Sequence, residues 1–470
     1  MSTQKNIVII GGGAVGPLLL KYISQQAKEK AINLSGVTFH LIDPKGFGNG
    51  GIAYGECHTN HALNSVAEEM SPFDKTAFKN FSQRKSVSLE KNKFYNRHLY
   101  KDFIKAEMVD RPIEYLENCG AHFIEYKKAA TIKQNGNKFD VLDINDNIIS
   151  DDLLCLEAHN IALTVGYGQN TKFQSLKGKD GFLHNPYSYT ETSLVDREPL
   201  LNDPQKRIAV FGSGPGLYDI ANELPQTYRS FYVFSGNGSG LAVRNLSLEV
   251  NEKSIPPQAL LSLDTNNNCE DAIKALKYEF EGAAQGRSKR RIALDIQKSL
   301  KEILLNMNKD VAKQFRQSTY LSPIRHMGTP IPQTSKARLE SFDPVFVKAH
   351  LCEEDIEVHA DGSFEIQVGA EKYSVDVIIN ATGHGRHNSP IIESLKKQGL
   401  AQVSDITNSL ETDGSGYRVI PSGLSVIGPA THVGCDGIES FAVYAEKWAK
   451  GLIDHICRYN RISNHRDFAQ

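Results

Sequence analysis

Two stretches of the sequence share one pattern, in which an apolar run leads into a cluster of glycines and then into a helix-like segment. The first stretch is KNIVIIGGGAVGPLLLKYI, Lys5–Ile23, and the second is KRIAVFGSGPGLYDIANEL, Lys206–Leu224. A strand, a glycine turn and a helix in this order form the phosphate-binding unit of dinucleotide domains, because the helix N-terminus offers unpaired N–H groups to the phosphates. Two such units, about two hundred residues apart, predict two dinucleotide-binding domains in one chain.

The composition agrees with a multidomain globular protein. A chain of 470 residues with 40% apolar and 23% charged residues has room for two or three domains with buried cores. The net charge of -2 gives no electrostatic footprint for nucleic acid or an anionic membrane. The apolar run Ile7–Leu20 is interrupted by three consecutive glycines and by Pro17, and it is too short to span a bilayer. We therefore expect a cytoplasmic protein without nucleic-acid or membrane partners.

The seven cysteines are scattered and form no C-x-x-C pair. This pattern predicts reduced thiols and argues against the dithiol relay of disulfide reductases. Cys57, His58 and His61 lie together in a glycine-rich loop, but no fourth ligand follows at a suitable spacing. The sequence therefore predicts no metal site.

The first unit carries the complete G-x-G-x-x-G pattern. The first glycine permits the tight turn, the second lets a pyrophosphate approach the backbone, and the third lets the helix pack closely on the strand. The next predicted strand, 36–43, ends on an acidic residue whose carboxylate can accept hydrogen bonds from an adenosine ribose. The predicted cofactor contacts in this unit are Gly11, Gly13, Ala14, Val15, Gly16 and Asp43.

The second unit departs from the pattern at one position, because Leu217 stands where the third glycine is expected. The strand that follows, 230–236, ends at Ser235-Gly236, so no carboxylate is predicted to meet a ribose there. This argues mildly against strict use of NAD. Arg244 is placed either to reach a 2′-phosphate or to form a surface salt bridge. The predicted cofactor contacts are Gly212, Gly214, Pro215, Gly216 and Ser235.

The rest of the chain adds strands and helices around these units. Helical periodicity covers 96–118 and 270–317, and the segment 121–150 alternates in polarity around Asn135-Gly136, which predicts a small antiparallel meander. The strands NIALTVG, 160–166, and DVIINATG, 376–383, both end in glycine. Such strand ends are typical of places where the chain passes from one dinucleotide domain to another. Gly383 removes a side chain where a ligand or a neighbouring strand approaches the backbone.

Four segments together carry a family resemblance: IIGGGAVG, GSGPGLYDIANEL, INATGHG and LSVIGPATHVGCDGIESFAVYAEKWAKGL. This set resembles the one shared by two-dinucleotide-domain flavoproteins. Within that group the chain is most similar to an FAD/NAD(P)-binding family related to N-hydroxylating and other flavin-dependent monooxygenases. The loop GGIAYGECHTNHALNSVAEEMS, 50–71, and the segments FLHNPY, 182–187, and IRHMGTPIP, 324–332, also look like parts of that family. The resemblance covers most of the chain except the helical stretch 246–317.

The resemblance implies an α/β architecture with two Rossmann-like domains. The FAD domain is discontinuous and comprises 1–170 and 375–470. The NAD(P)-binding domain, 200–374, is inserted into it and carries a helical insertion at about 246–330. In this family a basic residue often follows the serine at the end of the second domain's second strand. Here Gly236 occupies that place, so the choice between NADH and NADPH stays open.

The resemblance also implies a set of flavin contacts near the C-terminus. Asp436 is predicted to cap the last helix, with Glu439 as its capping-box partner. The N–H groups at that helix end would face the flavin, or the cap would serve only the helix. The additional predicted cofactor contacts are Asn64, Gly383, Gly428, Asp436 and Ile438.

Catalysis by such a protein rests mainly on the flavin, so no protein nucleophile is required. Asn64 lies near the flavin ring by resemblance, or acts only as a turn former. The residues that are candidates for binding nicotinamide or an anionic substrate, each with a structural role as the alternative, are Arg325, His326, His384 and Arg386.

The sequence thus predicts an FAD-dependent oxidoreductase that NAD(P)H reduces. The favoured subtype is a monooxygenase that acts on a small molecule with molecular oxygen. One alternative is a flavin-dependent dehydrogenase or reductase that passes electrons to another acceptor. The other is a flavin-binding sensor or regulatory protein without turnover. The sequence indicates neither the substrate nor the oligomeric state.

Overall fold

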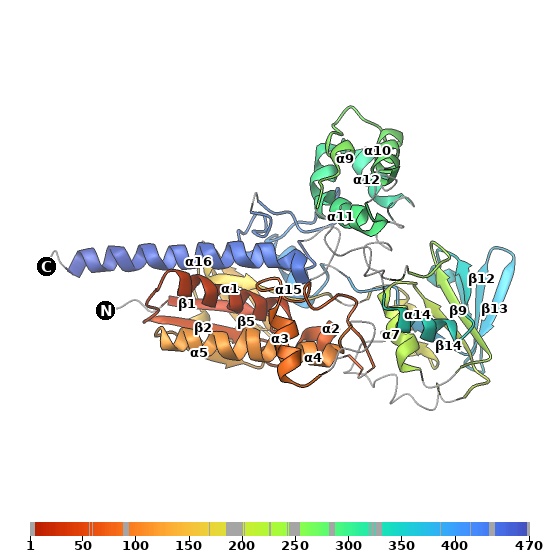
Figure 1. Ribbon diagram of the computed structural model, residues 1–470, viewed down its shortest axis with the longest axis horizontal. Coiled ribbons are helices and arrows are strands. Elements are labelled where there is room, and N and C mark those ends of the chain that lie inside the picture. The colour runs from red at the N-terminus through yellow and green to blue at the C-terminus, as the bar shows by residue number, and fades with distance from the viewer. Residues whose placement is uncertain are drawn as a thin grey trace.

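The computed structural model describes residues 5–467 apart from short gaps. The gaps are residues 56, 59, 88–93, 169, 185–200, 202, 225–226, 242, 244–253, 282–286, 319–320, 322–323, 325–330, 386, 414 and 432–437. For residues 438–440 and 459–467 only the backbone is described. Figure 1 shows an elongated molecule with one sheet toward each end and a separate group of helices beside the middle.

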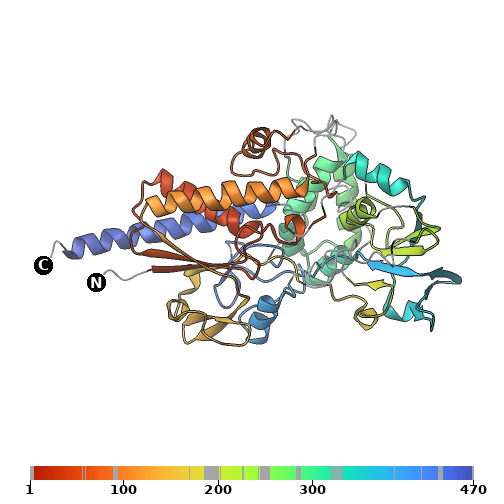
Figure 2. The same cartoon turned by 90° about the horizontal axis from the view of Figure 1, so that it is seen from below.

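The first sheet consists of five parallel strands. Their order is β15 (Ser425–Val426), β6 (Ile161–Leu163), β1 (Lys5–Ile10), β2 (Val37–Ile42) and β3 (His122–Tyr126). Residues 7–10 of β1 are buried, as expected for a central parallel strand covered on both faces. One face is covered by helices and the other by a small hairpin, so the sheet lies in the middle of this region (Figure 2).

The helices on the first sheet pack on one another as well as on the sheet. They are α1 (Val15–Glu29), α4 (Arg97–Phe103), a π-helical turn η1 (Ile104–Asp110), α5 (Arg111–Asn118) and the long C-terminal α16 (Ile438–Asp467). Helices α1 and α16 lie side by side along much of their length (Figure 1). The short helices α2 (Gly51–Tyr54) and α3 (Ala77–Arg84) lie in the connection after β2.

On the other face of the first sheet lies an antiparallel hairpin formed by β4 (Ala130–Asn135) and β5 (Lys138–Asp143). It packs with α15 (Pro390–Lys397) against the buried side chains of β1 and β6. The prediction of a hairpin turning at Asn135-Gly136 is confirmed. The prediction that β3 belongs to the same meander is wrong, because β3 pairs in parallel with β2 at the sheet edge. An edge strand alternates in polarity in either kind of sheet, so its pattern does not distinguish the two.

The second sheet also has five parallel strands. Their order is β10 (Val345–Lys348), β9 (Ser230–Ser235), β8 (Arg207–Phe211), β14 (Val377–Asn380) and β7 (Phe182–Leu183). Helices α7 (Pro215–Glu223) and α14 (Gln333–Glu340) pack together beside it. Strand β14 lies in this sheet, although the residues from 375 onward are predicted to belong to the first domain.

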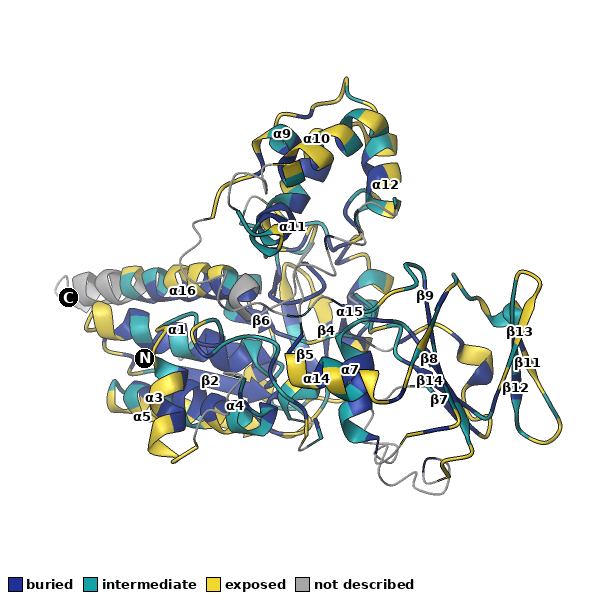
Figure 3. Ribbon diagram, turned by 45° about the vertical axis from the view of Figure 1, so that its right-hand side comes forward, coloured by how far each residue is buried: buried dark blue, intermediate teal, exposed yellow. Residues whose placement is uncertain are grey.

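A small antiparallel sheet packs against the second sheet. Its strands are β11 (Ile356–Val358), β12 (Phe364–Val368) and β13 (Glu371–Val375). Phe364 of β12 is fully buried in one cluster with Phe211 of β8. Figure 3 shows the buried strands of both parallel sheets between more exposed elements.

The group of helices beside the middle has its own apolar core. Its members are α9 (Gln258–Leu261), α10 (Cys269–Glu281), α11 (Lys289–Asn306) and α12 (Lys309–Gln317). Ile296 of α11 and Phe315 of α12 are completely buried in that core. Lys301 donates to the Thr412 hydroxyl at 2.8 Å, which ties this group to the C-terminal part of the chain. The helical insertion predicted at about 246–330 corresponds to these helices.

Four short 3₁₀ turns complete the described secondary structure: Asp151–Leu153, Ala158–Asn160, Gln174–Leu176 and Glu353–Asp355. In the part of the chain that the structure describes, no helix is long and apolar enough to cross a membrane.

Candidate functional site

The first glycine-rich turn joins β1 to α1, and its glycines are required by close backbone contacts. Gly11 has a φ of +112°, and a Cβ there would lie 2.5 Å from the carbonyl oxygen of Thr164. A Cβ on Gly16 would lie 2.0 Å from the carbonyl oxygen of Gly11. The first glycine therefore permits the turn and the third lets α1 lie against β1, as the sequence predicts.

The middle of this turn has unused hydrogen-bond donors. Among the described residues, no hydrogen bond is made by the backbone N–H groups of Gly13, Ala14, Val15 or Gly16. Pro17, in the first turn of α1, has no N–H to satisfy. A Cβ on Gly13 would meet nothing closer than 3.4 Å. Four free donors at the N-terminus of a 15-residue helix fit the pyrophosphate of a dinucleotide such as FAD.

Asp43 lies directly beside the first turn, at the end of β2. Its carboxylate accepts hydrogen bonds from the backbone N–H of Gly12 at 2.7 Å, from the N–H of Lys45 at 2.8 Å and from the side chain of Asn49 at 2.8 Å. Burial raises the pKa of this carboxyl, although the hydrogen bonds act in the opposite direction. The carboxylate thus fixes the turn itself, and its contact with a ribose stays a prediction.

The loop after β2 covers the first turn. The N–H of Gly48 donates to the carbonyl of Gly12 at 2.8 Å, and a Cβ on Gly12 would lie 2.7 Å from the Cα of Phe47. The loop continues into α2, whose Gly51 lies next to Gly13. The first turn is therefore enclosed by protein on this side.

The second glycine-rich turn, between β8 and α7, repeats part of this geometry. Gly212 has a φ of +103°, and a Cβ there would lie 2.4 Å from the carbonyl oxygen of Ala381. No atom of the described residues lies within 4 Å of the Cβ position of Gly214. Pro215 begins α7, a position that suits proline because the first helical N–H has no partner in the helix. Leu217, in place of the third glycine, is fully buried.

A large cavity of about 1280 Å³ opens in front of the second turn and extends to the first region. Its described lining includes Phe211–Gly216 and Ser235–Asn237 from the second sheet, Ile52–Tyr54 and Leu63–Ser65 from the first region, and Arg316–Ser318 from the end of α12. Three parts of the chain therefore enclose one space. Its size exceeds that of most small-molecule pockets, which suits a dinucleotide together with a second ligand.

The end of β14 forms one wall of this cavity. Thr382 donates to the side-chain oxygen of Asn380 at 2.7 Å and accepts a hydrogen bond from Asn170 at 3.0 Å. Gly383 has a φ of +97°, and a Cβ there would meet no atom within 4 Å. Gly383 therefore leaves room for a ligand on the cavity side, and no described strand fills that room.

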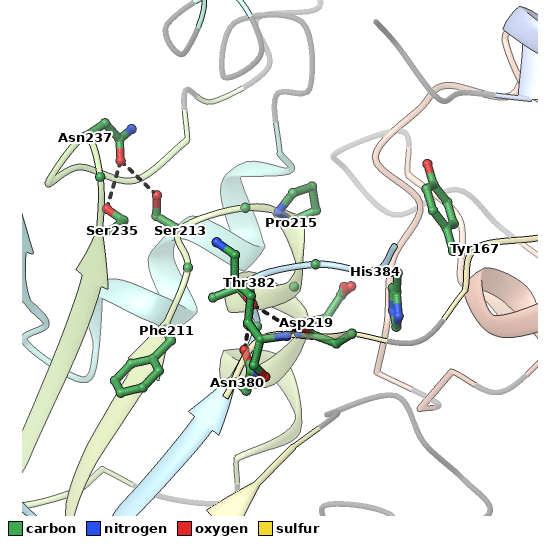
Figure 4. Close-up of a pocket in the computed structure, with 18 of the residues that line it drawn as sticks. Tyr167, Phe211, Ser213, Pro215, Asp219, Ser235, Asn237, Asn380, Thr382 and His384 are labelled. Atoms are coloured by element: carbon green, nitrogen blue, oxygen red, sulfur yellow. Dashed lines mark hydrogen bonds between the residues drawn. The ribbon is translucent and has the colours of Figure 1, made fainter. Parts of the chain in front are cut away.

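His384 follows at the opposite end of the cavity from Asn237, close to Tyr167 (Figure 4). The centroids of the His384 and Tyr167 rings lie 6.1 Å apart. Burial lowers the pKa of His384 below its ordinary value of 6.5, so the ring is neutral at neutral pH. A neutral ring presents a hydrogen-bonding group to a ligand without adding a charge.

A buried ion pair and a buried histidine–carboxylate contact connect the first region to α7. Arg97, at the start of α4, donates to both carboxylate oxygens of Asp219 at 2.9 Å. The two side chains are only 10% and 7% exposed. The Nε2 atom of His61 lies 2.8 Å from a carboxylate oxygen of Glu223, and these two side chains are 0% and 4% exposed. These contacts hold the helix of the second turn in a fixed position against the first region, and Arg97 and Asp219 also line the cavity.

The structure brings together only some of the predicted site residues. Those that line the cavity are Asn64, Gly212, Gly214, Pro215, Gly216, Ser235, Gly383 and His384. The described lining contains no residue of the first turn, Gly11–Gly16. Gly428 has a φ of +149° and lies next to Val165. Asp436, Arg244, Arg325, His326 and Arg386 lie outside the described residues, and Ile438 begins α16 with its side chain not described.

Several residues of the cavity are not predicted by the sequence. Arg97 and Asp219 are far apart in the chain, and no local pattern pairs them. Lys348 and His350 line the cavity because β10 lies beside β9, a neighbour relation that sequence periodicity does not reveal. Among the described residues, no group of three or more His, Cys, Asp or Glu side chains is arranged to hold a metal ion.

Comparison with known proteins supports the assignment of the first region. Residues 8–167 match the family model described as FAD-NAD(P)-binding. This part of the chain contains β1, the first turn, the covering loop and β6. A search of curated proteins found no match.

Solved structures share the fold of nearly the whole chain. L-lysine 6-monooxygenase from Pseudomonas syringae matches with a TM-score of 0.51 and 13% identity, over 96% of this chain and 99% of its own. Ornithine hydroxylase from Pseudomonas aeruginosa matches with a TM-score of 0.50 and 12% identity, over 97% and 100%. Bacillithiol disulfide reductase from Bacillus cereus matches with a TM-score of 0.50 and 12% identity, over 96% and 99%. At this identity the matches show that the chain shares the fold of these proteins, and they leave the reaction open.

Proposed function

We propose that this protein is an FAD-dependent oxidoreductase that is reduced by NAD(P)H and oxidises a small molecule with molecular oxygen. One observation carries the proposal: a single cavity reaches from the open glycine turn at Gly212 to Asn64 in the loop that follows the first turn. A nicotinamide nucleotide on the second turn can therefore extend toward a flavin held by the first. FAD supplies the electron-transfer chemistry when it is bound.

The residues of the chain bind and orient the two nucleotides. The free N–H groups at Gly13–Gly16 hold the pyrophosphate of FAD, and Asp43 keeps that turn in shape through Gly12. Gly214 and Gly216 leave the backbone of the second turn open to the other pyrophosphate. Gly383 gives the nicotinamide end room beside β14. Arg97 and Asp219 hold α7, and with it the second turn, against the first region.

The described cysteines favour oxidation of a small molecule over reduction of a disulfide. None of the six free cysteines that the structure describes contributes to the described lining of the cavity. Cys57 is buried close by, and its thiol donates to the carbonyl of Tyr54 at 3.2 Å. Burial raises the pKa of this thiol, which keeps it protonated and a poor nucleophile. Cys435 lies outside the described residues.

The cavity contains a group suited to an anionic substrate. Arg316, at the end of α12, lines the cavity beside Gln317 and Ser318. No ion pair or hydrogen bond involves Arg316 in the part of the chain that the structure describes. A guanidinium group binds carboxylates well, so amino acids and other carboxylates are the first compounds to screen as substrates.

The test begins with purified protein loaded with FAD and mixed with NADH or NADPH in the absence of oxygen. We expect the flavin absorbance to bleach with at least one nucleotide. Oxygen is then admitted in the presence of amino acids, amines or aromatic compounds. A monooxygenase forms a hydroxylated product and releases less hydrogen peroxide than the NAD(P)H it oxidises. The variant Gly214→Asp is the matched control, because it places a carboxylate at the nucleotide turn without touching the first turn.

Three outcomes contradict parts of the proposal. Failure to bind FAD would show that the first turn is not the binding site of the FAD pyrophosphate. Binding of FAD without reduction by either nucleotide favours a flavin-binding sensor. Reduction followed by stoichiometric peroxide release with every compound, together with rapid reduction of an added quinone or disulfide, favours a reductase.

A further inference from the structure

The cavity has a charged end that the proposed function does not yet explain. This end lies where β9 stops, at Ser235, Gly236 and Asn237. In a dinucleotide domain the adenosine ribose lies beside the end of the second strand, and a carboxylate there binds the 2′-hydroxyl of NAD. The segment 235–237 contains no carboxylate.

Two basic residues approach the same place, one from the end of the neighbouring strand and one from just beyond it. Strand β10 runs parallel to β9, and Lys348 is paired in register with Ser235. The N–H of Ala349 then donates to the carbonyl of Ser235 at 3.0 Å. Lys348 and His350 therefore lie at the end of β9, and both line the cavity.

The glycines at the end of β9 permit this approach. A Cβ on Gly236 would lie 2.3 Å from the Cε1 atom of His350. Gly238 has a φ of +65°, and a Cβ there would lie 2.8 Å from the Cβ of Lys348. The absence of side chains at 236 and 238 thus lets the two basic residues pack against this turn.

A hydrogen-bonded group of polar side chains completes this end of the cavity (Figure 4). The hydroxyl of Ser235 donates to the Oδ1 atom of Asn237 at 2.8 Å, and that of Ser213 donates to the same atom at 3.2 Å. These bonds fix the amide of Asn237 and join the second glycine turn to the end of β9. No ion pair neutralises Lys348 or His350 among the described residues.

We propose that Lys348 and His350 form a subsite for the 2′-phosphate of NADPH, so that the protein uses NADPH in preference to NADH. The proposal rests on the nucleotide site at Gly212 that the proposed function assumes. Position 236 has no basic residue, and Lys348 at the end of β10 and His350 two residues after it supply the basic groups instead. Lysine supplies a point charge to a phosphate, and the imidazole supplies a hydrogen bond.

The test uses the full-length FAD-loaded protein and two nucleotide fragments, 2′,5′-ADP and 5′-AMP, which differ only in the 2′-phosphate. Titration calorimetry at low salt is expected to show that 2′,5′-ADP binds roughly 30-fold to 100-fold more tightly than 5′-AMP. Lys348→Met should weaken 2′,5′-ADP about tenfold and leave 5′-AMP unchanged. The double variant Lys348→Met/His350→Leu should abolish the preference.

The matched control is Lys372→Met, which removes a lysine of the same domain that pairs with Glu365 on β12. It should leave both affinities unchanged. Equal binding of the two fragments by the wild-type protein, or a preference that survives in the double variant, overturns the proposal. Neither fragment carries nicotinamide, so the measurement does not depend on flavin reduction. Tight binding of 2′,5′-ADP without reduction by NADPH would sustain the subsite and contradict the proposed function.

Discussion

In both glycine turns the first glycine has a positive φ and lies against the carbonyl of a neighbouring segment, Gly11 against Thr164 and Gly212 against Ala381. The turns differ at the third position. Gly16 leaves no room for even a methyl group, whereas the second turn accommodates the buried side chain of Leu217. The first helix therefore lies closer to its turn than the second helix does, and the first turn tolerates less change.

The first turn is also more closely surrounded by protein than the second. The first turn is covered by the loop at 47–51 and fastened by Asp43. The second turn faces a cavity of about 1280 Å³. An enclosed turn suits a cofactor that stays bound, and an open turn suits one that exchanges in every cycle. The contrast supports a division of labour between a resident FAD and a transient nicotinamide nucleotide.

The largest difference in tolerance to substitution should appear at the position of the third glycine, which is Gly16 in the first turn and Leu217 in the second. Gly16→Ala puts a methyl group 2.0 Å from the carbonyl oxygen of Gly11, so α1 must move away from β1. We expect protein that is insoluble or free of FAD. Leu217→Ala instead leaves a cavity that costs about 3 kcal/mol and retains FAD. The measurements are soluble yield, flavin content and urea unfolding. Full flavin occupancy in Gly16→Ala would contradict the tight packing of the first turn.

A charge in the middle of each turn should separate the two cofactors. Gly13 and Gly214 both have room for a Cβ, so a carboxylate there acts mainly by repelling phosphate. Like charges in contact cost several kcal/mol, which corresponds to a loss of roughly a thousandfold in affinity. Gly13→Asp should lose FAD and still bind 2′,5′-ADP. Gly214→Asp should keep FAD and lose 2′,5′-ADP.

The alanine variants of the same glycines provide the controls. Gly13→Ala and Gly214→Ala introduce the Cβ without the charge, so both proteins should fold and keep most of their affinity for the two ligands. Flavin content and calorimetric titration with 2′,5′-ADP measure the two sites separately. If Gly13→Asp retains FAD, Gly13 does not lie at the phosphates. If both aspartate variants lose both ligands, the division of labour between the turns is wrong.

The sequence predicted both turns because each depends on a local pattern. Apolar residues followed by glycines at fixed spacing determine β1, its turn and α1 with little help from the rest of the chain. The two positive φ values at Gly11 and Gly212 are likewise requirements that only glycine meets easily.

The surroundings of the second turn could not be predicted in this way. The contact between Arg97 and Asp219 joins residues 122 positions apart. The approach of Lys348 to Ser235 depends on β10 pairing with β9. Such neighbours arise from the order of strands in the sheet, and local periodicity contains no information about that order. The same holds for β3, whose alternating polarity fits an antiparallel meander although the strand pairs in parallel with β2.

The buried ion pair between Arg97 and Asp219 determines whether the two regions behave as one unit. Asp219→Asn leaves the guanidinium of Arg97 buried without a carboxylate, which should cost about 3 kcal/mol. Trp448, the single tryptophan, is buried in α16 and donates to Ser425 of the first sheet at 2.9 Å. Its fluorescence therefore reports on the first region, whereas circular dichroism reports on both.

In the wild-type protein the two signals should change together during urea unfolding. In Asp219→Asn we expect circular dichroism to change at lower urea concentration than the fluorescence, because the second region loses its contact with the first. Glu340→Gln is the control, since Glu340 pairs with Lys336 on the exposed face of α14 and should contribute less than about 0.5 kcal/mol. Coincident transitions in Asp219→Asn, with unchanged stability, would show that the pair does not couple the regions.

Acid should have the smallest effect on stability, and it should act on the first region through the buried His40 and on the second through the half-buried His384. Burial lowers the pKa of His40 in β2 and of His384 at the end of β14 below the ordinary value of 6.5. The unfolded chain therefore takes up protons near pH 6.5, before the folded chain does. The contribution of these histidines to the free energy of unfolding is therefore fully present above pH 6.5. It decreases as the pH falls toward their pKa values in the folded protein.

Variants of these histidines assign the acid effect to one region or the other. In His40→Gln, the stability measured by Trp448 fluorescence should decline less steeply below pH 6.5, because both residues belong to the first region. In His384→Gln, the shallower decline should appear mainly in the stability measured by circular dichroism. Urea unfolding at a series of pH values measures both. A decline that is as steep in both variants as in the wild-type protein would mean that other groups control the acid response.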